Sequence, residues 1–571
     1  MYEYKVWMKI LLVAWGMVST VCANADSMFV KRVAPSVINH DNGQITLDYG
    51  SVRFADFKLK GDLKNAGHPI RLVIRESAIP IPLPSTGPEP IGVRYLDTKV
   101  IATHHFTTTP LRRADGRLMD DNRRVMPFRY VDIYGWKGQF SPELVESNYA
   151  VAPDFQRRGG VTFFGSEQAK SLNRLWRLMD STLESTSFAG VFVDGDRERL
   201  PYEADGYINA LGWYYLVGDT VTPRKTFAYL VEHPSWPTEW QAHLIFMAWA
   251  DYLYTGDKQW LKEQYDWLKT VSLLDVIDNK GLVNIENLNK SQKKALKVTY
   301  PMGDIVDWPK NQRDGHDMRP YNTVTNAFIY KGLVDMQNIA LALGNDKDAT
   351  RFSDGARRIK QALNEQARDT NGLFVDGVGS SHSSAHSLFI PWGFGLVNGD
   401  TSVLENALKA RVQAYQGGFP CSVFAAQFLL ETYFEAGLDD EAIALMLNRS
   451  LRGWFNMLDR YDATVTHEAW DVSFKDNEDW THAWGAAPAN VIPKYVIGIR
   501  PLEAGWKTWT FQPSPALQAS FKAQFPTPLG MIKASYDMTS QRYTLTVPAN
   551  SVAHVKIRDE VFELQTGTHS F

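Results

Sequence analysis

The chain has 571 residues, which is too long for one hydrophobic core, so we expect two or three domains. Hydrophobic residues make up 44% of the chain and charged residues 22%, values that are ordinary for a globular protein and exclude a disordered one. The formal net charge is −4 and the basic residues form no run or stripe, which argues against nucleic acid or an anionic membrane surface as a partner.

The N-terminus, residues 1–25, has the pattern of a secretory signal peptide. Lys5 and Lys9 precede the apolar run ILLVAWGMVSTV, which leads to the small-residue cleavage site ANA. The apolar run is too short to span a bilayer comfortably, which disfavours a membrane anchor. We therefore expect cleavage after Ala25, a periplasmic or secreted protein, and no membrane attachment after cleavage.

Cleavage leaves Cys421 as the one cysteine of the mature chain, so no internal disulfide can form. This cysteine lies in the apolar segment PCSVFAAQFLL, which predicts a small core residue rather than a nucleophile. The folded chain must therefore be held together by its hydrophobic core.

Residues 26–165 are predicted to be mostly β. The segments QITLDYG, HPIRLVIRES, VRYLDTKVI and FRYVDIYGW alternate apolar and polar residues or are rich in β-branched and aromatic types. Clusters of glycine and proline, such as PIPLPSTGPEP, separate them. We expect a β-sandwich here.

Residues 166–500 are predicted to be helical. In SLNRLWRLMDSTL, Leu172, Leu175, Trp176 and Met179 fall on one helical stripe. Later segments such as TEWQAHLIFMAWADYLYTG and SVFAAQFLLETYFEAG are apolar nearly all round and end on glycine, the usual C-cap residue. The helical segments come in pairs without a fixed-period repeat, which favours helix pairs closed into a ring over a simple solenoid.

Residues 501–571 return to a β pattern. The short segments TWTFQPS, ASFKAQF, MIKASYD, YTLTVPA and HVKIRDEVFEL have strand character and are separated by turn residues. The predicted order is therefore a β-domain, a large helical domain and a small C-terminal β-domain.

The stretch DGDRERLPYEAD, residues 194–205, is unusually charged. Pro201 fits the first turn of a helix, and Glu203 would then lie where negative charge suits the helix dipole. A helix start does not explain the acids and arginines crowded into the preceding loop, residues 194–199. That loop is either a structural ion network or part of a catalytic site.

A second acidic cluster, THEAWDVSFKDNEDWTHAWG, spans residues 466–485. Its acids alternate with tryptophans, which predicts a pocket with an acidic floor and aromatic walls, although a polar surface loop with one or two buried tryptophans would give the same pattern. His467 and His482 match no ligand spacing that we recognise, so we expect no metal site.

Two carboxylates from distant loops, converging in one pocket, are what glycoside hydrolysis requires. One carboxyl must be protonated to donate to the leaving oxygen, and the other must be ionised. An aromatic wall raises the pKa of one acid, while neighbouring arginines keep another acid charged.

The first loop resembles the motif of the α-L-rhamnosidases of glycoside hydrolase family 78. That family carries an Asp, then Arg-Glu-Arg, then an Asp seven residues after the Glu. Here the tripeptide is Arg197-Glu198-Arg199, and Asp205 lies seven residues after Glu198. The leading Asp194 is one residue closer than usual.

The resemblance covers most of residues 166–510, and the flanking β-domains come in the same order as in the family. Further segments resemble helical hairpins and the pocket loop of the family, and these are residues 234–257, 303–308, 382–397, 453–470 and 481–506. The single motifs are modest, but their order together is fairly specific.

The resemblance implies a mainly α, multidomain fold. An (α/α)6 barrel over residues 166–500 would be flanked by an N-terminal β-sandwich over 26–165 and a small C-terminal β-sandwich over 501–571. It implies an exported inverting glycoside hydrolase that needs no cofactor. Its substrate would be a carbohydrate, from which it releases terminal α-L-rhamnose or a closely related sugar.

On this resemblance Glu198 is the general acid and Glu468 the general base, with a carboxyl separation of about 6.5–9.5 Å. The residues expected to bind sugar are Asp194, Arg199, Asp205, Asp307, Trp308, Trp470, Trp480 and His482. Each of the tryptophans could equally be a core residue, and Asp307 could instead cap a loop.

The chain also departs from the family. Gly195-Asp196 replaces the usual Cys-Pro, and Pro201-Tyr202 replaces the usual Gly-Trp. The pocket wall therefore differs from that of the family, and the preferred sugar need not be ordinary L-rhamnose. Two alternatives remain, another six-hairpin glycosidase such as an unsaturated-uronyl hydrolase and a catalytically inactive carbohydrate-binding protein. A purely structural protein would explain the helix pairs but not the two acidic loops.

Overall fold

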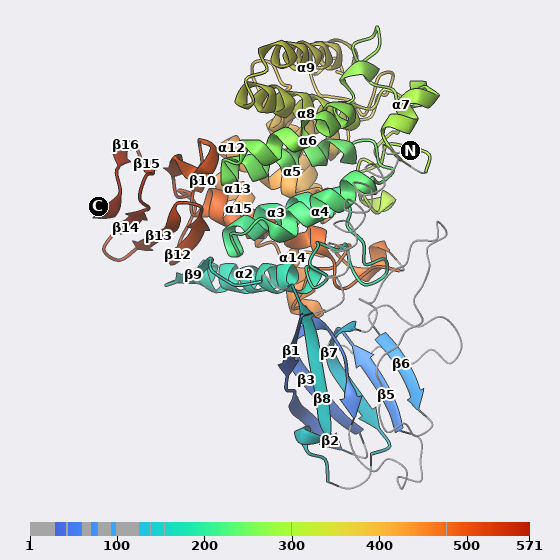
Figure 1. Ribbon diagram of the computed structural model, residues 1–571, viewed down its shortest axis with the longest axis vertical. Helices are drawn as coiled ribbons and strands as arrows, with labels where there is room; N and C mark the ends of the chain where they lie inside the picture. Colours follow the sequence, from blue (N-terminus) through green and yellow to red (C-terminus); the bar gives the residue numbers. More distant parts are fainter. Residues whose placement is uncertain are drawn as a thin grey trace, which may run out of the picture.

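The computed structural model describes residues 29–41, 44–59, 70–77, 93–98, 125–136, 139–152, 155–298, 300–475 and 477–571. The predicted signal peptide lies outside the described residues. Within them, no helix combines the length and the apolar character needed to cross a membrane. The chain passes from an N-terminal sheet, drawn at the bottom of Figure 1, through a mainly helical region to two C-terminal sheets at the left.

The N-terminal sheet is antiparallel throughout, with the strand order β1-β8-β3-β7-β5-β6, while β2 pairs with β3 and β4 pairs with β8. Alternate residues of the longest strand, among them Ile45 and Leu47, are buried, as expected for a strand with one face on a core. The predicted strands of this region are confirmed. Their bounds are β1 Phe29–Val33, β2 Ser36–Asp41, β3 Gln44–Ala55, β4 Lys58–Leu59, β5 Ile70–Arg75, β6 Val93–Thr98, β7 Met126–Tyr134 and β8 Val145–Val151.

The helical region follows the predicted periodicity. Its helices are α2 Glu167–Thr186, α3 Glu203–Leu216, α4 Val221–Glu232, α5 Trp240–Thr255, α6 Lys258–Val271, α7 Lys290–Ala295, α8 Thr323–Ala342, α9 Asp346–Gln366, α10 Ala385–Gly393, α11 Ser402–Ala414, α12 Ala426–Glu435, α13 Asp439–Met446, α14 Trp454–Arg460 and α15 Pro488–Val491. Some of these helices contact one another in a cycle, in which each helix contacts the next and the last contacts the first. The order of the cycle is α3, α5, α8, α10, α12, α15. These helices therefore form a closed ring.

Outer helices pack on the ring in pairs, with α4 on α3, α6 on α5, α9 on α8, α11 on α10, α13 on α12 and α2 on α15. The burial of side chains follows this division. Ring helix α5 is buried continuously from Trp240 to Ala248, whereas α6 buries a stripe of Leu261, Tyr265 and Leu268. Helix α5 ends at Gly256, whose φ of 72° is the left-handed conformation of a helix C-cap.

The C-terminal residues form two sheets, one with the order β10-β11-β15-β16 and one with the order β17-β14-β13-β12-β9. Their apolar side chains share the main hydrophobic core of the chain. The bounds are β9 Gly160–Phe164, β10 Ile499–Pro501, β11 Thr508–Phe511, β12 Ser520–Thr527, β13 Gly530–Asp537, β14 Arg542–Val547, β15 Val552–Ile557, β16 Glu560–Leu564 and β17 Gly567–Ser570.

Strand β9 differs from the expectation that residues 26–165 form one β region. It pairs antiparallel with β12, so it extends a C-terminal sheet rather than the N-terminal one. The physical reason is that Val161 and Phe163 alternate onto the buried face of that sheet, beside Phe521 and Ala523. Helix α2 then leads from this sheet back to the N-terminal sheet (Figure 1).

The N-terminal sheet contacts the loops that carry the two acidic clusters. Arg199, in the first loop, donates to the carbonyl of Val125, the residue before β7, at 2.8 Å. The Thr481 hydroxyl donates to a Glu76 carboxylate oxygen at 2.5 Å. The N-terminal sheet therefore supports both loops from one side. Cys421 is buried in the helical core, as predicted.

Candidate active site

The loop before α3 is closed by Asp194. Its amide donates to the Leu200 carbonyl at 2.9 Å, and its carboxylate accepts from the Leu200 amide at the same distance. Helix α3 begins at Glu203, two residues later than the position of Pro201 suggested. The residues between Asp194 and Leu200 are thus held as a compact loop at the N-terminus of the helix.

Glu203 lies in the first helical turn, as predicted, but it is fully buried rather than solvated. Its carboxyl accepts hydrogen bonds from the Ser235 amide, at 2.9 Å, and from the Ser235 hydroxyl. Burial raises the pKa of Glu203 to about 7, although the two contacts with Ser235 favour the ionised form. Glu203 therefore connects the start of α3 to the segment that precedes α5.

The second loop holds Glu468 from several sides. The Glu468 amide donates to the Asp479 carbonyl at 2.8 Å, and the Asp479 amide donates to the Glu468 carboxylate at 3.0 Å. The Trp484 indole donates to the Glu468 carbonyl at 2.9 Å. These contacts fix both the backbone and the side chain of Glu468.

The two loops pack directly against each other. The Ala483 amide donates to the Asp194 carbonyl at 2.7 Å, and the Arg197 amide lies 3.2 Å from both carboxylate oxygens of Asp479. Gly195 allows this approach, because a Cβ at this position would lie 2.7 Å from an Asp479 carboxylate oxygen and 2.7 Å from the Thr481 carbonyl. The glycine that replaces the family's cysteine is thus required by the contact between the loops.

A cavity of about 260 Å³ opens between the loops and the N-terminal ends of α3 and α5. Both residues predicted to be catalytic, Glu198 and Glu468, line it. Four of the residues predicted to bind sugar also line it, namely Asp194, Asp205, Trp308 and His482. The structure therefore brings together carboxylates that are far apart in the sequence.

Arg197 bridges the two predicted catalytic carboxylates. Its Nη2 lies 3.3 Å from Glu468 Oε1 and 3.9 Å from Glu198 Oε1, and its Nη1 lies 3.1 Å from Glu468 Oε2. Arg197 Nη2 contacts both acids. The distance between Glu198 Oε1 and Glu468 Oε1 is therefore no greater than the sum of their distances to Nη2. Such spacing lets one glycosidic bond fit between the carboxyls of a glycoside hydrolase.

The environment of Glu468 keeps it ionised. Burial raises its pKa, but His482, Arg197 and Lys475 outweigh burial and lower the pKa to about 2. The donors crowd one oxygen, since Oε2 contacts Lys475 Nζ at 2.9 Å as well as Arg197 and the Asp479 amide. On the other oxygen, Oε1, the one donor among the described residues is Arg197. Oε1 is therefore the atom with room to accept a proton.

Glu198 has a different environment. Its side chain is 37% exposed, compared with 2% for Glu468, so it faces the open part of the cavity. The Tyr202 hydroxyl donates to Glu198 Oε2. Tyr202, which takes the place of the family's tryptophan, thus contacts the carboxyl predicted to be the general acid.

The other acids of the cavity favour the protonated form. Burial raises the pKa of Asp194 and of Asp205 well above the ordinary value, and burial lowers the pKa of His482 to about 3. Asp205 Oδ1 lies 3.4 Å from His482 Nδ1, and neither atom has a hydrogen-bond partner within the described part of the chain. Both residues line the cavity, and these two buried atoms face each other.

Three residues at the site offer atoms that could approach a metal ion. Asp194, Asp479 and His482 each present one ligand atom, and within the described ranges these atoms lie no more than 4.8 Å from one another. The Asp194 carboxylate already accepts from the Leu200 amide and the Asp479 carboxylate from the Arg197 amide. Burial raises the pKa of Asp479 to about 7, so its carboxyl retains a proton in much of the neutral range. Protein contacts therefore account for the cluster.

Two residues predicted to bind sugar lie outside the cavity because they hold the fold together. Arg199 is buried, donates to the Val125 carbonyl at 2.8 Å and pairs with Asp196 at 2.5 Å. Asp307 is fully buried and accepts from His386 at 2.6 Å and from the Ser422 amide at 2.8 Å. Asp307 therefore links the loop of residues 303–308 to the segments that carry His386 and Ser422. This structural role resembles the loop-capping role that the sequence analysis gave as the alternative to sugar binding.

Two predicted tryptophans are also core residues. Trp470 is fully buried, stacks on Phe419 with ring centroids 4.8 Å apart and donates to the Cys421 carbonyl at 2.7 Å. Trp480 is 5% exposed and stacks on His467 with ring centroids 5.2 Å apart. Neither ring lines the cavity, so the core alternative applies to both of them.

The cavity contains further residues that the sequence analysis did not assign to it. These are Arg197, Tyr202, Trp236, Trp240, Ile305 and Trp484. Several of them lie beside assigned residues, and the segment PSWPTEW before α5 places two tryptophans close together, which is the signal that could have identified Trp236 and Trp240. The aromatic wall therefore comes mainly from segments other than the one around Trp470.

Comparisons with known proteins identify the family of the chain. The model of the bacterial alpha-L-rhamnosidase 6 hairpin glycosidase domain matches residues 161–496, and that of the bacterial alpha-L-rhamnosidase C-terminal domain matches residues 498–571. A search of curated proteins found no match.

Solved structures share the fold at low sequence identity. The α-L-rhamnosidase of Dictyoglumus thermophilum is 17% identical with a TM-score of 0.73, over 95% of this chain and 64% of that one. The Streptomyces avermitilis α-L-rhamnosidase complexed with L-rhamnose is 18% identical with a TM-score of 0.71, over 95% and 53%. The α-L-rhamnosidase of Aspergillus terreus is 17% identical with a TM-score of 0.71, over 96% and 64%.

The chain thus spans between 53% and 64% of the length of these structures. The family model for the six-hairpin domain covers more than half of the chain and includes both loops of the cavity. The chain belongs to the bacterial α-L-rhamnosidase six-hairpin glycosidase family.

Proposed function

We propose that the protein is an exported inverting glycoside hydrolase that releases terminal α-L-rhamnose, or a closely related sugar, from oligosaccharides or glycosides. One observation carries the proposal, namely that Glu198 and Glu468 come from distant loops and meet around Arg197 in one cavity. Two carboxyls that flank the scissile bond are the chemical requirement of this reaction.

In the proposed reaction Glu198 is the general acid and Glu468 the general base. Glu468 removes a proton from water through Oε1 while the water oxygen attacks the anomeric carbon. The glycosidic C–O bond breaks, and Glu198 gives its proton to the leaving oxygen. An inverting enzyme separates these carboxyls by about 6.5–9.5 Å to leave room for the water.

The remaining cavity residues suit a sugar ring. Asp205 and His482, which line the cavity, would bind sugar hydroxyls. Trp308 and Trp236 offer aromatic surface to the apolar face of the ring. The contact of Tyr202 with Glu198 is the place where the preference for one sugar over another would differ from that of relatives.

We assign residues 166–500 to an (α/α)6 barrel, residues 26–165 to an N-terminal β-sandwich and residues 501–571 to a C-terminal β-sandwich. The ring of α3, α5, α8, α10, α12 and α15 supports the barrel. The signal-peptide pattern of residues 1–25 supports export to the periplasm or beyond.

The test is hydrolysis of methyl α-L-rhamnoside, whose leaving group must be protonated, by Glu198→Gln and Glu468→Gln. We expect each variant to lose about 10²–10⁴-fold in kcat, the usual contribution of a general acid or base. Glu198→Gln should unfold close to the wild-type temperature, whereas Glu468→Gln should stay folded but unfold at a lower temperature, because it loses buried ion pairs with Arg197 and Lys475. Glu560→Gln, on exposed strand β16, is the matched control and should keep full activity. Full activity in either cavity variant would overturn the assignment.

The stereochemistry is tested by proton NMR of the first product formed from an α-L-rhamnoside. Inversion predicts that β-L-rhamnose appears first and then mutarotates, and α-L-rhamnose as the first product would contradict it. Wild-type protein that hydrolyses unsaturated uronides instead, or that binds sugar without hydrolysis, would favour the alternative six-hairpin glycosidase or the inactive binding protein.

A further inference from the structure

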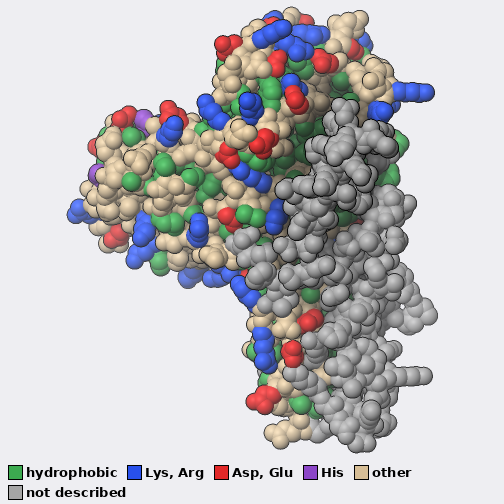
Figure 2. Space-filling model, viewed as in Figure 1, with side chains coloured by type: hydrophobic (Ala, Val, Ile, Leu, Met, Phe, Trp, Pro, Cys, Tyr) green, Lys and Arg blue, Asp and Glu red, His purple; other side chains and the backbone are tan. Residues whose placement is uncertain are grey.

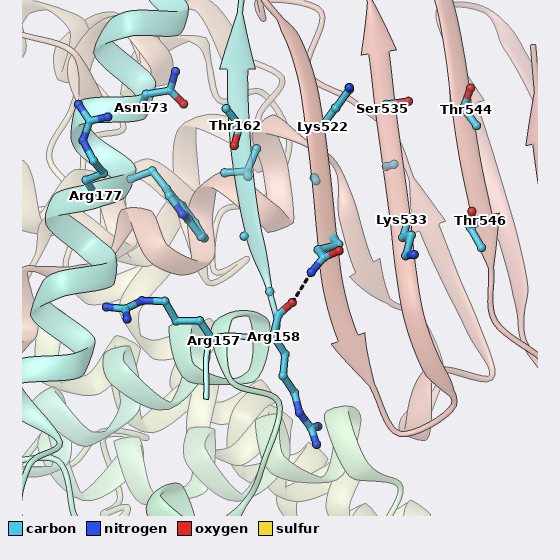
Figure 3. Close-up of a pocket in the computed structure, with 17 residues that line it drawn as sticks. Arg157, Arg158, Thr162, Asn173, Arg177, Lys522, Lys533, Ser535, Thr544 and Thr546 are labelled. Atoms are coloured by element: carbon cyan, nitrogen blue, oxygen red, sulfur yellow. Dashed lines mark hydrogen bonds between the residues drawn. The ribbon is translucent and has the colours of Figure 1, made fainter. Parts of the chain in front are cut away.

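A second, larger cavity of about 860 Å³ lies between α2 and the five-stranded C-terminal sheet (Figure 3). It shares no lining residue with the cavity of Glu198 and Glu468. Helix α2 connects the two cavities. Its first half borders the larger cavity, and the carbonyl of its last residue, Thr186, accepts a hydrogen bond from the amide of Val193, next to Asp194. At ~1.5 Å of rise per residue the helix is about 30 Å long. We call the larger cavity the sheet groove.

The sheet groove is formed by one face of the sheet. Lys522 pairs with Thr162 on one side and Ser535 on the other, and the next row of the same face pairs Gln524 with Lys533. Successive residues of a strand point to opposite faces, so the intervening Phe521 and Ala523 are buried while the lysines are exposed. Figure 3 shows Lys522, Lys533, Ser535, Thr544 and Thr546 side by side on neighbouring strands.

The sheet groove carries an excess of positive charge. Its basic lining residues are Arg157, Arg158, Arg177, Lys522 and Lys533, and no acidic residue among those that the structure describes lines it. Arg157 is neutralised by Asp180 at 2.7 Å and Glu184 at 2.6 Å. The other basic residues of the groove are exposed and have no ion-pair partner in the part of the chain that the structure describes. Lys and Arg side chains gather over this region in Figure 2, near β12, β9 and the start of α2.

This concentration of charge is unexpected in a chain whose net charge is −4. Like charges on one sheet face repel each other, so the arrangement costs stability unless a counter-charge is present. A groove lined with one sign of charge concentrates ligands of the opposite sign. The charge therefore points to an anionic ligand.

The neutral residues of the sheet groove fit a saccharide. Hydroxyls of Thr162, Ser535, Thr544 and Thr546 line it, and their donors and acceptors can serve sugar hydroxyls. The indole of Trp176 contributes aromatic surface. The Gln524 side chain donates to the Arg158 carbonyl at 2.7 Å and thereby holds the end of the groove together (Figure 3).

We propose that the sheet groove binds an anionic oligosaccharide, with its carboxylates or sulfates paired to Lys522, Lys533, Arg177 and Arg158. The choice of a saccharide over other polyanions rests on the proposed function, whereas the choice of an anion rests on the charges of the groove. The groove would hold an acidic segment of a longer chain while the cavity of Glu198 and Glu468 acts on another chain end. The protein would then favour acidic polysaccharides over neutral ones.

The test measures binding of dextran, carboxymethyl-dextran and dextran sulfate by isothermal titration calorimetry. These polymers share one backbone and differ in charge, so they separate carboxylate from sulfate recognition. We compare the wild type with Lys522→Gln/Lys533→Gln and with the control Lys507→Gln/Lys556→Gln, which removes the same charge from exposed positions outside the groove.

We expect the wild type to bind at least one charged dextran, to bind it more weakly at high salt and not to bind dextran. The groove variant should bind about fivefold more weakly, as expected from the loss of two partly exposed charge contacts, and the control should bind as the wild type does. Both variants should hydrolyse p-nitrophenyl α-L-rhamnoside at the wild-type rate.

Equal binding by the groove variant and the wild type would overturn the proposal, as would no binding of either charged dextran. Tighter, groove-dependent binding of single-stranded DNA or of phosphatidylglycerol vesicles would overturn the assignment to a saccharide. Binding is measured without turnover, so a protein that binds charged dextran through the groove but lacks rhamnosidase activity would contradict the proposed function and support the groove.

Discussion

The carboxyl of Glu468 is almost completely buried, and burial alone would raise its pKa. His482, Arg197 and Lys475 oppose burial and lower the pKa to about 2, from an ordinary value of 4.5. The folded state therefore gains stability from these contacts above the ordinary pKa of 4.5, and it loses that stability as the pH falls toward 2. A general base with this pKa stays ionised at any pH where the enzyme is expected to work.

Replacing Lys475 with methionine removes one of these cations while it keeps the length of the side chain. Lys475 Nζ lies 2.9 Å from Glu468 Oε2, so its loss should raise the pKa of Glu468 toward the ordinary value. We expect the acidic limb of the pH profile of kcat/KM to move to higher pH in Lys475→Met. The profile is measured with an aryl rhamnoside between pH 3 and 9, a range that lies above the wild-type limb near pH 2, so a raised pKa appears as an acidic limb that the wild type lacks there.

Lys507→Met, at an exposed position in the C-terminal region, is the control for loss of charge and should leave the profile unchanged. A Lys475→Met protein that is folded and active and has the wild-type acidic limb would show that Glu468 does not control that limb.

Tyr202 gives a second prediction at the scale of one residue. Its hydroxyl donates to Glu198 Oε2 and fixes the direction of that carboxyl. We expect Tyr202→Phe to lower kcat by about tenfold or more, because small displacements of a reacting group are costly, and to change KM less. Tyr300→Phe, at an exposed position, is the control. A wild-type kcat in Tyr202→Phe would remove Tyr202 from the positioning of Glu198.

The acidic clusters pointed to both loops and the resemblance to the family selected Glu198 and Glu468 within them, but neither could say which arginine faces the cavity. Arg197 and Arg199 flank Glu198 alike in the sequence. In the structure Arg199 has a φ of 55°, a left-handed conformation that sends its side chain to the N-terminal sheet instead. The sequence could not separate cavity tryptophans from core tryptophans for a similar reason. Trp470 and Trp484 belong to the same acidic cluster, but Trp470 stacks on Phe419 in the core, whereas Trp484 lines the cavity.

At the scale of elements, the site depends on how closely two loops approach. Gly195 is the contact point, and a Cβ there would meet both Asp479 and the Thr481 carbonyl. We expect Gly195→Ala to push the loops apart, to destabilise the protein by about 1–3 kcal/mol as overpacking does, and to lower kcat/KM. Thermal unfolding and hydrolysis of an aryl rhamnoside measure the two effects.

Gly160→Ala is the matched control, because a Cβ at Gly160 meets nothing within 4 Å. If Gly195→Ala and Gly160→Ala have the same stability and the same activity, the close contact of the loops is not needed for the site.

The helices were predictable because they depend on local periodicity, and the predicted stripe of Leu172, Leu175, Trp176 and Met179 is the buried face of α2. Strand β9 was not predictable in the same way. Its pattern shows a strand, but its partner β12 lies more than 350 residues later in the chain. Strand pairing at such distance is a tertiary property that a local pattern does not contain.

At the scale of the whole molecule, the N-terminal sheet supports the catalytic loop through Arg199. Its guanidinium donates to the Val125 carbonyl, pairs with Asp196 and lies 5.1 Å from the ring centroid of Phe54. We expect Arg199→Met to lower kcat/KM, although Arg199 does not line the cavity, because Asp196 is left without its buried partner beside Glu198. Removing one member of a buried pair costs about 3–5 kcal/mol, so thermal unfolding should also occur at a lower temperature.

Arg157→Met is the control, since Arg157 also forms ion pairs, with Asp180 and Glu184, but lies away from the loop. A larger loss of kcat/KM in Arg157→Met than in Arg199→Met would contradict the role of the N-terminal sheet.

The central claim is that Glu198 donates the proton and Glu468 activates the water, and leaving-group dependence tests it most directly. The measurement is kcat of Glu198→Gln and Glu468→Gln on aryl α-L-rhamnosides whose phenols differ in acidity. We expect Glu198→Gln to recover activity on the most acidic phenol, which needs no protonation, and Glu468→Gln to remain inactive on all of them. Recovery in Glu468→Gln, with Glu198→Gln inactive on every substrate, would contradict the central claim.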